Sequence, residues 1–169
     1  MRYNYTFLIL FLIFTGTLSA QQDAMYTKYM FNSLVFNPAY AGAKDHASIG
    51  LLHRTQWWGI DGAPTTQTLT AHTPLRNDRV GVGMTLYNDA IGPTNTLGAN
   101  LAYSYRIPMG QNGKLAIGLQ GGIMNWRADW TRLNLPDNVD PAFDEGNVNM
   151  WLPNFGTGIY YYTPNFYVG

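Results

Sequence analysis

The alternation of apolar and polar residues in the middle of the chain sets the expected class of fold. Along residues 97–107, every second residue is apolar or aromatic, and the residues between them are small or polar. A helix with Leu101 in its apolar stripe would also have to bury Asn100 and Ser104, so the pattern predicts a β-strand. The same alternation resumes at residues 113–126, after a polar turn.

The division of residues between the two faces of these strands is unusual for a soluble protein. Large apolar residues lie on one face, and glycine, serine, asparagine and glutamine lie on the other. A soluble β-sandwich would bury its large residues and expose charges, whereas a membrane barrel meets lipid outside and encloses a polar lumen. The strands are also as long as the ~9–11 residues that cross a bilayer. We therefore predict an all-β fold, a transmembrane antiparallel outer-membrane β-barrel that is partial, with about six or seven strands present.

Six strands and the start of a seventh are expected, joined by connections of alternating length. Short connections at 74–78, 108–112 and 163–164 and longer ones at 56–65, 89–95 and 127–152 match the periplasmic turns and outer loops of bacterial barrels. This topology places Trp57-Trp58, Asn88-Asp89 and the 127–152 loop outside. The expected strands cover residues 45–55, 66–73, 79–88, 96–107, 113–126 and 153–162, and the seventh begins at Asn165.

The number of expected strands does not close a barrel. Bacterial barrels of this kind are even-numbered and leave no free edge in lipid, and the final residues 167–169 fall within an alternating run. We expect the N-terminal part of a longer barrel, with an eight-stranded barrel completed in another way as the weaker option. Unpaired backbone groups in lipid cost roughly several kcal/mol each, so the short chain is expected to misfold, to be degraded or to pair with another chain.

The N-terminus is expected to form two further units. Arg2, the apolar run 7–14 and the small residues before Gln21 are typical of a signal peptide over residues 1–20. Residues 21–44, which we call the leader, are rich in aromatic residues and lack regular alternation. The leader is expected either to dock against the barrel lumen or its periplasmic rim, or to form a first irregular strand. The partial barrel then covers residues 45–169.

Composition supports a membrane β-barrel and excludes other classes. Ten basic and ten acidic residues cancel, and only 12% of residues are charged, against about 25% in soluble domains. No basic stripe is present to neutralise phosphates, so nucleic acid is not expected as a partner. The chain has no cysteine, which excludes disulfides and thiolate metal sites. Tyrosine, tryptophan and glycine are abundant without a long apolar run after the N-terminus, which favours a barrel over a helical membrane protein.

Catalytic, cofactor and metal sites are not expected. The histidines lack the spacing of a metal motif, and no GxSxG sequence positions a nucleophile, although a hydrolase with catalytic groups at a barrel rim is a competing reading. The acidic residues of the longest loop lack the order of ligands in an EF-hand, so a solvated loop is favoured. Calcium binding by this loop is the alternative. The histidines are His46, His53 and His72, and the acidic residues of the longest loop are Asp137, Asp140, Asp144 and Glu145.

Aromatic residues gather near the expected strand ends, at Trp57-Trp58, at Trp126 with Trp130, and at 160–162. An interface girdle explains such clusters. The QWWGIDGAPTT loop, however, carries more bulk and turn chemistry than anchoring needs. We therefore hypothesise that this loop and the leader at 37–40 form the partner-binding parts. The candidate residues are Asn37, Pro38, Tyr40, Gln56, Trp57, Trp58, Asp61, Gly62 and Pro64.

Four segments carry a resemblance to a known family. The leader sequence YMFNSLVFNPAYAG, then RTQWWGIDGAPTT from Arg54, YNDAIG from Tyr87 and YSYRI from Tyr103 resemble the PorP/SprF family of type IX secretion system membrane proteins. The similarity extends from about residue 22 to about residue 162 in the family's order, and the chain is similar to the first half to two-thirds of a member.

The resemblance implies a non-enzymatic outer-membrane barrel, exported by a signal peptide, that works with the type IX secretion and gliding machinery of Gram-negative bacteria. It implies as partners outer-membrane lipid, secretion-system proteins including a periplasmic peptidoglycan-binding lipoprotein, and for some members a secreted adhesin held at the surface. The alternative from another class is a channel for small or hydrophobic solutes, like a porin or fatty-acid transporter, for which a polar lumen is equally suitable.

Overall fold

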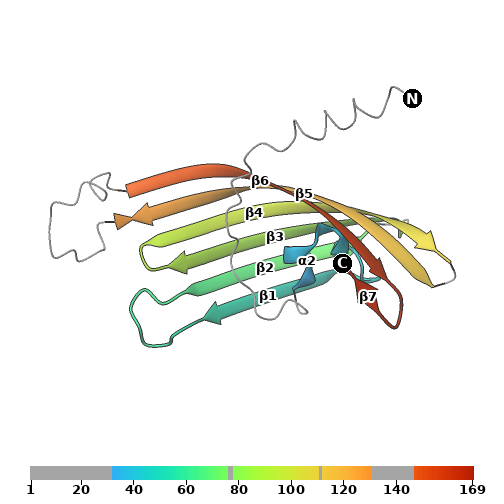
Figure 1. Ribbon diagram of the computed structural model, residues 1–169, viewed down its shortest axis with the longest axis horizontal. Helices are drawn as coiled ribbons and strands as arrows, with labels where there is room; N and C mark the ends of the chain where they lie inside the picture. The colour runs from blue at the N-terminus through green and yellow to red at the C-terminus, as the bar shows by residue number, and fades with distance from the viewer. Residues whose placement is uncertain (1–31, 76–77, 111, 131–146) are drawn as a thin grey trace, which may run out of the picture.

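Seven antiparallel strands in sequence order form one sheet (Figure 1). The computed structural model describes residues 32–75, 78–110, 112–130 and 147–169. Within these residues, two short helical turns, α2 (Ser33–Phe36) and η2 (Pro38–Tyr40), precede the strands. No helix in the described residues is long and apolar enough to cross a membrane. The strands are β1 (Ser48–Thr55), β2 (Thr65–Pro74), β3 (Val80–Ile91), β4 (Thr94–Met109), β5 (Gly113–Asp129), β6 (Asn147–Tyr162) and β7 (Tyr167–Val168).

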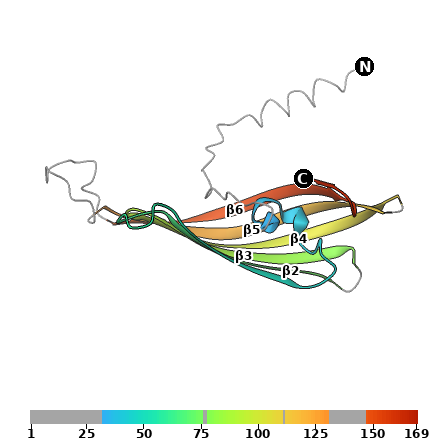
Figure 2. The same cartoon turned by 90° about the horizontal axis from the view of Figure 1, so that it is seen from below.

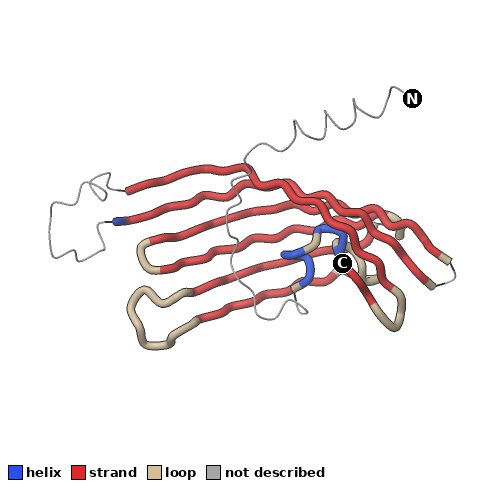
Figure 3. The backbone as a smooth tube through the Cα atoms, in the orientation of Figure 1, coloured by secondary structure: helices blue, strands red, loops and turns tan. Residues whose placement is uncertain are grey.

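The sheet is curled into a half-barrel, which confirms the predicted fold class. Each strand pairs with the next one along the chain, so the topology is a simple meander. In Figure 2 the sheet bends around α2 and η2, and Figure 3 shows that strands form nearly all of the described backbone. The expected signal peptide, the first part of the leader and the acidic residues of the longest loop lie outside the described residues.

The two faces of the sheet differ as the alternation predicts. In β4, Leu101 is 67% exposed, whereas its neighbour Ala102 is 7% exposed beneath the leader. We call the face that carries Leu101 the apolar face and the face that carries Ala102 the inner face. The apolar face continues across the other strands with residues such as Leu119 and Phe155, which are also exposed. Exposed apolar surface of this extent suits contact with lipid.

The predicted longer loop at residues 89–95 is wrong. β3 continues to Ile91 and β4 begins at Thr94, so the connection is a tight turn in which Gly92 has a φ of 54°. Asp89 lies within β3, where its Oδ1 accepts a hydrogen bond of 2.5 Å from the Thr66 hydroxyl. Polar residues in this stretch resemble a loop in the sequence, but cross-strand hydrogen bonds keep them in the sheet. The strict alternation of short and long connections therefore fails at this hairpin.

Several strands are longer than expected. β4 extends to Met109, β5 to Asp129, and β6 begins at Asn147 instead of at Pro153. Pro153, the expected start of this strand, cannot donate a backbone hydrogen bond, yet it lies within β6. Among the described strands, only β5 pairs with β6 at Pro153, because β7 pairs only with Tyr161 and Tyr162. β6 is therefore an edge strand at Pro153, and an edge strand tolerates proline. β1 and β7 begin later than expected, at Ser48 and Tyr167.

Candidate partner-binding sites

The described part of the leader docks on the inner face of the sheet. Leu34 packs with Ala41 and Ala102 of β4, and Ala39 packs with Ala116 of β5 and Tyr160 of β6. Three glycines of the sheet lie directly beneath this segment and leave room for it. A Cβ atom at these positions would collide with the leader, at Gly81 with Ala41, at Gly118 with Pro38 and Ala39, and at Gly158 with Asn37.

Two polar side chains of β4 bind the leader through its backbone. The Ser104 hydroxyl donates a 2.5 Å hydrogen bond to the carbonyl of Ala41. The Arg106 guanidinium donates to the carbonyl of Gly42 and, at 3.0 Å, to the carbonyl of Val80 in β3. Arg106 is 2% exposed, and a buried charge of this kind is stable only when it is hydrogen-bonded. Arg106 therefore joins the leader to the β3–β4 hairpin.

The Asn37–Tyr40 stretch is held by its own turn chemistry and by the sheet. The Asn37 side chain accepts a hydrogen bond of 2.9 Å from the Ala39 amide, which caps η2, and donates one of 2.9 Å to the carbonyl of Ile159. The Tyr40 ring contacts the rings of His72 and Tyr160 edge-on, with centroids 5.3 and 5.4 Å apart. Burial, followed by nearby Tyr167, raises the pKa of the Tyr40 phenol, so this group stays neutral.

His72 contributes a hydrogen bond that orients the end of the leader. Its Nδ1 accepts a 3.2 Å hydrogen bond from the amide of Gly42, which requires that Nδ1 carries no proton. Gly42 itself has a φ of 67°, a conformation that glycine adopts without steric cost. The leader thus leaves the inner face through a turn that His72 and Arg106 hold from two sides.

These contacts decide between the two expectations for the leader. For the described part of the leader, docking against the inner face of the sheet is confirmed. An irregular first strand is wrong for this part, because Ser33–Phe36 and Pro38–Tyr40 form helical turns. Asn37, Pro38 and Tyr40 contact their own sheet, and their contact with a partner stays a prediction. The clamp formed by Ser104 and Arg106 was not predicted from the sequence. The available signal was an arginine among small residues on the inner face, because such a charge needs a partner.

The loop between β1 and β2 is the second candidate region, and it is exposed at the opposite end of the strands. Trp58 is 90% exposed and Trp57 67% exposed. The loop is closed by a 2.9 Å hydrogen bond from the Gln56 amide to the Pro64 carbonyl, and the Gly62 carbonyl accepts a 2.9 Å bond from the Gly92 amide of the next hairpin. The backbone that presents these indoles is therefore tied at two points.

Trp57 has a backbone conformation that is rare for a bulky residue. Its φ is 51°, in the left-handed region, which costs an L-residue about 1–2 kcal/mol. Strain of this kind is concentrated at functional sites. This backbone conformation sets the direction in which the exposed Trp57 side chain leaves the loop. Large aromatic residues are enriched among binding hot spots. Gln56, Asp61, Gly62 and Pro64 shape the same loop.

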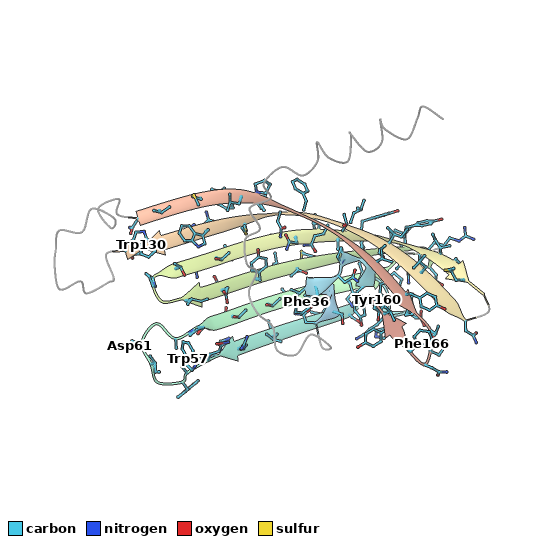
Figure 4. The ribbon with its side chains drawn as sticks, in the orientation of Figure 1. Phe36, Trp57, Asp61, Trp130, Tyr160 and Phe166 are labelled. Carbon is cyan, nitrogen blue, oxygen red and sulfur yellow. The ribbon has the colours of Figure 1, made fainter. Side chains whose placement is uncertain are left out.

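The structure does not bring the two candidate regions together. Figure 4 shows Trp57 and Asp61 at one end of the sheet, Phe36 near its middle and Tyr160 further toward the other end. Tyr160 also departs from the expected interface girdle, because it is 8% exposed and packs on the inner face against Tyr40. Among the residues that the structure describes, no three or more His, Cys, Asp or Glu side chains gather as a metal site would need.

Comparisons with known proteins give one match. The family model described as type IX secretion system membrane protein PorP/SprF matches residues 18–169. No curated protein and no solved structure matches the chain. The matched range includes the whole described leader, the exposed β1–β2 loop and all seven strands.

Proposed function

The chain belongs to the PorP/SprF family of type IX secretion system membrane proteins, and we propose that it is a non-enzymatic protein of the outer membrane that binds partner proteins. Through this binding it supports the export and surface attachment of those partners. The observation that carries the proposal is the exposed Trp57-Trp58 pair, which a strained and hydrogen-bonded loop holds beyond the ends of the strands. Rigid, exposed aromatic residues suit protein contact, because little conformational entropy is lost when they bind.

The arrangement of the sheet supports the proposed outer-membrane location. A curled antiparallel sheet with an apolar face is the element that crosses the outer membrane, and residues 1–20 supply the export signal. The division into signal peptide, leader of residues 21–44 and barrel of residues 45–169 is part of this proposal. In this orientation the β1–β2 loop faces the cell exterior, and the turns after β2 and β4 face the periplasm.

The docked leader supports protein binding over the alternative of a solute channel. Residues 34–42 cover the inner face of β3–β6, with Arg106 and Ser104 already occupied by the leader backbone. A solute channel would use this face as its polar lining. The proposed partners are therefore proteins. In line with the family resemblance, we propose a peptidoglycan-binding lipoprotein on the periplasmic side and an exported adhesin on the outer side.

Removal of the two exposed indoles tests the proposal. The double variant Trp57→Ala and Trp58→Ala is expected to lower recovery of secretion-system proteins by about tenfold or more, which is the effect of losing an interface hot spot. Folding should change by no more than about 0.5 kcal/mol, because both side chains are exposed. The measurement is affinity purification of the tagged chain, after crosslinking, from membranes of a bacterium with a type IX secretion system.

A matched control for this experiment is Leu75→Ala, since Leu75 is an exposed apolar residue at the other end of the sheet. This variant is expected to leave recovery unchanged. Equal recovery of secretion-system proteins by the double variant and the unmodified chain would contradict the assignment of the loop.

A further inference from the structure

A polar cavity lies at the end of β4, β5 and β6 nearest to the turn that joins β3 and β4. Its volume is about 530 Å³, and polar side chains of three strands line it. This volume falls within the ~300–1,000 Å³ of small-molecule sites. The side chains that the argument uses are Asn95 of β4, Arg127 and Asp129 of β5, and Asn147 and Asn149 of β6.

Hydrogen bonds across the sheet hold several of these groups in place. The register sets Arg127 beside Asn95 on one side and Asn149 on the other. The Arg127 Nε donates to the Asn125 side-chain carbonyl at 2.5 Å, and the Asn125 amide donates to the Asn149 side-chain carbonyl at 2.5 Å. The Asn95 amide donates to the Asn88 side-chain carbonyl at 3.0 Å. We call Asn95, Arg127 and Asn149, which lie side by side on the three strands, the polar row. The polar row therefore presents preorganised amide and guanidinium groups.

This row lies on the apolar face, where a band of apolar residues ends. Along β4 the same face carries Leu97 and Leu101, and along β6 it carries Phe155 and Trp151, all of them exposed. A bilayer core does not accommodate a row of amides and a guanidinium. The polar row therefore marks the headgroup layer, and Trp151, which is 62% exposed beside Asn125, stands at the boundary.

We propose that this cavity binds the saccharide headgroup of a membrane glycolipid whose acyl chains lie along the apolar face below it. Sugar hydroxyls both donate and accept hydrogen bonds, and amides, a guanidinium and a carboxylate offer complementary groups of both kinds. Beside the cavity, the exposed indole of Trp151, two residues from the lining Asn149 on β6, adds an apolar plate for the face of a sugar ring. The inference rests on the membrane orientation of the proposed function, but it concerns lipid and not the secretion partners.

The composition of the cavity favours a sugar over a simple anion. Arg127 is the only basic residue that lines the cavity in the part of the chain that the structure describes, and the Asp129 carboxylate lies next to it in the lining. A phosphate site would gather several positive donors and no carboxylate. Three asparagines, at 95, 147 and 149, contribute neutral amides instead.

The test measures glycan binding to the full chain in phosphatidylcholine nanodiscs. One probe is intact lipopolysaccharide and the other is its deacylated core oligosaccharide, so that the arms separate lipid-borne from free sugar. Trp151→Ala and Asn95→Ala are each expected to weaken binding of both probes, by about tenfold for the indole and about threefold for the amide. Trp151→Phe retains most of the binding because it keeps an aromatic ring.

Matched controls are Phe166→Ala and Arg79→Ala, which alter an exposed aromatic residue and an exposed arginine away from the cavity. Both are expected to bind like the unmodified chain. The inference is overturned if neither probe binds, if inorganic phosphate competes as well as the oligosaccharide, or if the Trp151→Ala and Asn95→Ala variants bind both probes unchanged. Recovery of secretion-system proteins is a separate readout, so a failure of this site and a failure of the proposed function are distinguishable.

Discussion

Gly118→Val is expected to release the leader from the inner face of the sheet. A Cβ at residue 118 would overlap the backbone of Pro38 and Ala39, and backbone cannot move aside as a flexible side chain can. Overpacking of this kind costs about 1–3 kcal/mol. We expect docking to weaken by about 2 kcal/mol, which corresponds to a roughly 30-fold change in the docking equilibrium.

The release is measured by the reactivity of a single thiol in the leader. The natural chain has no cysteine, and Leu34 is 2% exposed in the docked leader. A Leu34→Cys chain in lipid vesicles should therefore react slowly with a water-soluble maleimide. Adding Gly118→Val should accelerate the reaction about 30-fold when opening precedes labelling.

Gly121→Val is the matched control, because this glycine lies on the same strand but on the apolar face. A Cβ there would meet only Phe155, no closer than 3.9 Å. Labelling of Leu34→Cys should be unchanged in this background. Equal acceleration by both substitutions would mean that general loss of stability, and not collision with the leader, exposes residue 34.

Arg106→Ala should destabilise the whole sheet and not only the leader. The guanidinium joins the carbonyls of Gly42 and Val80, and hydrogen bonds to a charged group contribute about 1.5–3 kcal/mol each. Alanine would leave the buried Gly42 carbonyl without this donor, and the Val80 carbonyl would keep only its 2.8 Å bond from the Leu75 amide. We expect a loss of about 3 kcal/mol in the free energy of unfolding, measured by urea unfolding from lipid vesicles with tryptophan fluorescence.

Two comparisons separate the hydrogen bonds of Arg106 from its charge. Arg106→Lys keeps the charge but cannot reach two carbonyls with a planar fork, so it should recover at most about half of the loss. Arg79→Ala removes an exposed arginine that directly precedes β3, and it should change stability by no more than about 0.5 kcal/mol. Unfolding of Arg106→Ala at the same urea concentration as the unmodified chain would contradict the role of the clamp.

The sequence was sufficient to predict the strands and their faces. The period-2 alternation around Leu101 and Ala102 follows directly from the geometry of a pleated strand, which sends successive side chains to opposite faces. Large apolar residues on one face and small residues on the other make that pattern stronger here than in most soluble sheets. The family resemblance on the leader and the β1–β2 loop was confirmed by the family match over residues 18–169.

The parts that the sequence did not predict depend on cross-strand and long-range contacts. The sequence predicted a loop at Asp89, whereas the structure places it in β3. Its hydrogen bond to Thr66 reaches a residue of another strand, so local sequence does not reveal it. Arg106 could be placed on the inner face by parity, but its partner Gly42 is 64 positions away in the chain. Such pairings arise only when the sheet is assembled, and no local pattern encodes them.

The central claim is that one face of the sheet meets lipid while the leader covers the other. Leu101→Cys and Ala102→Cys, compared in lipid vesicles, test it most directly because the two positions are adjacent on β4 and differ in face. We predict that residue 101 reacts with a lipid-soluble maleimide only, and that residue 102 reacts with neither reagent until Gly118→Val admits a water-soluble one. Rapid water-soluble labelling at residue 102 with the leader intact, or equal labelling of both positions by the lipid-soluble reagent, would contradict the account.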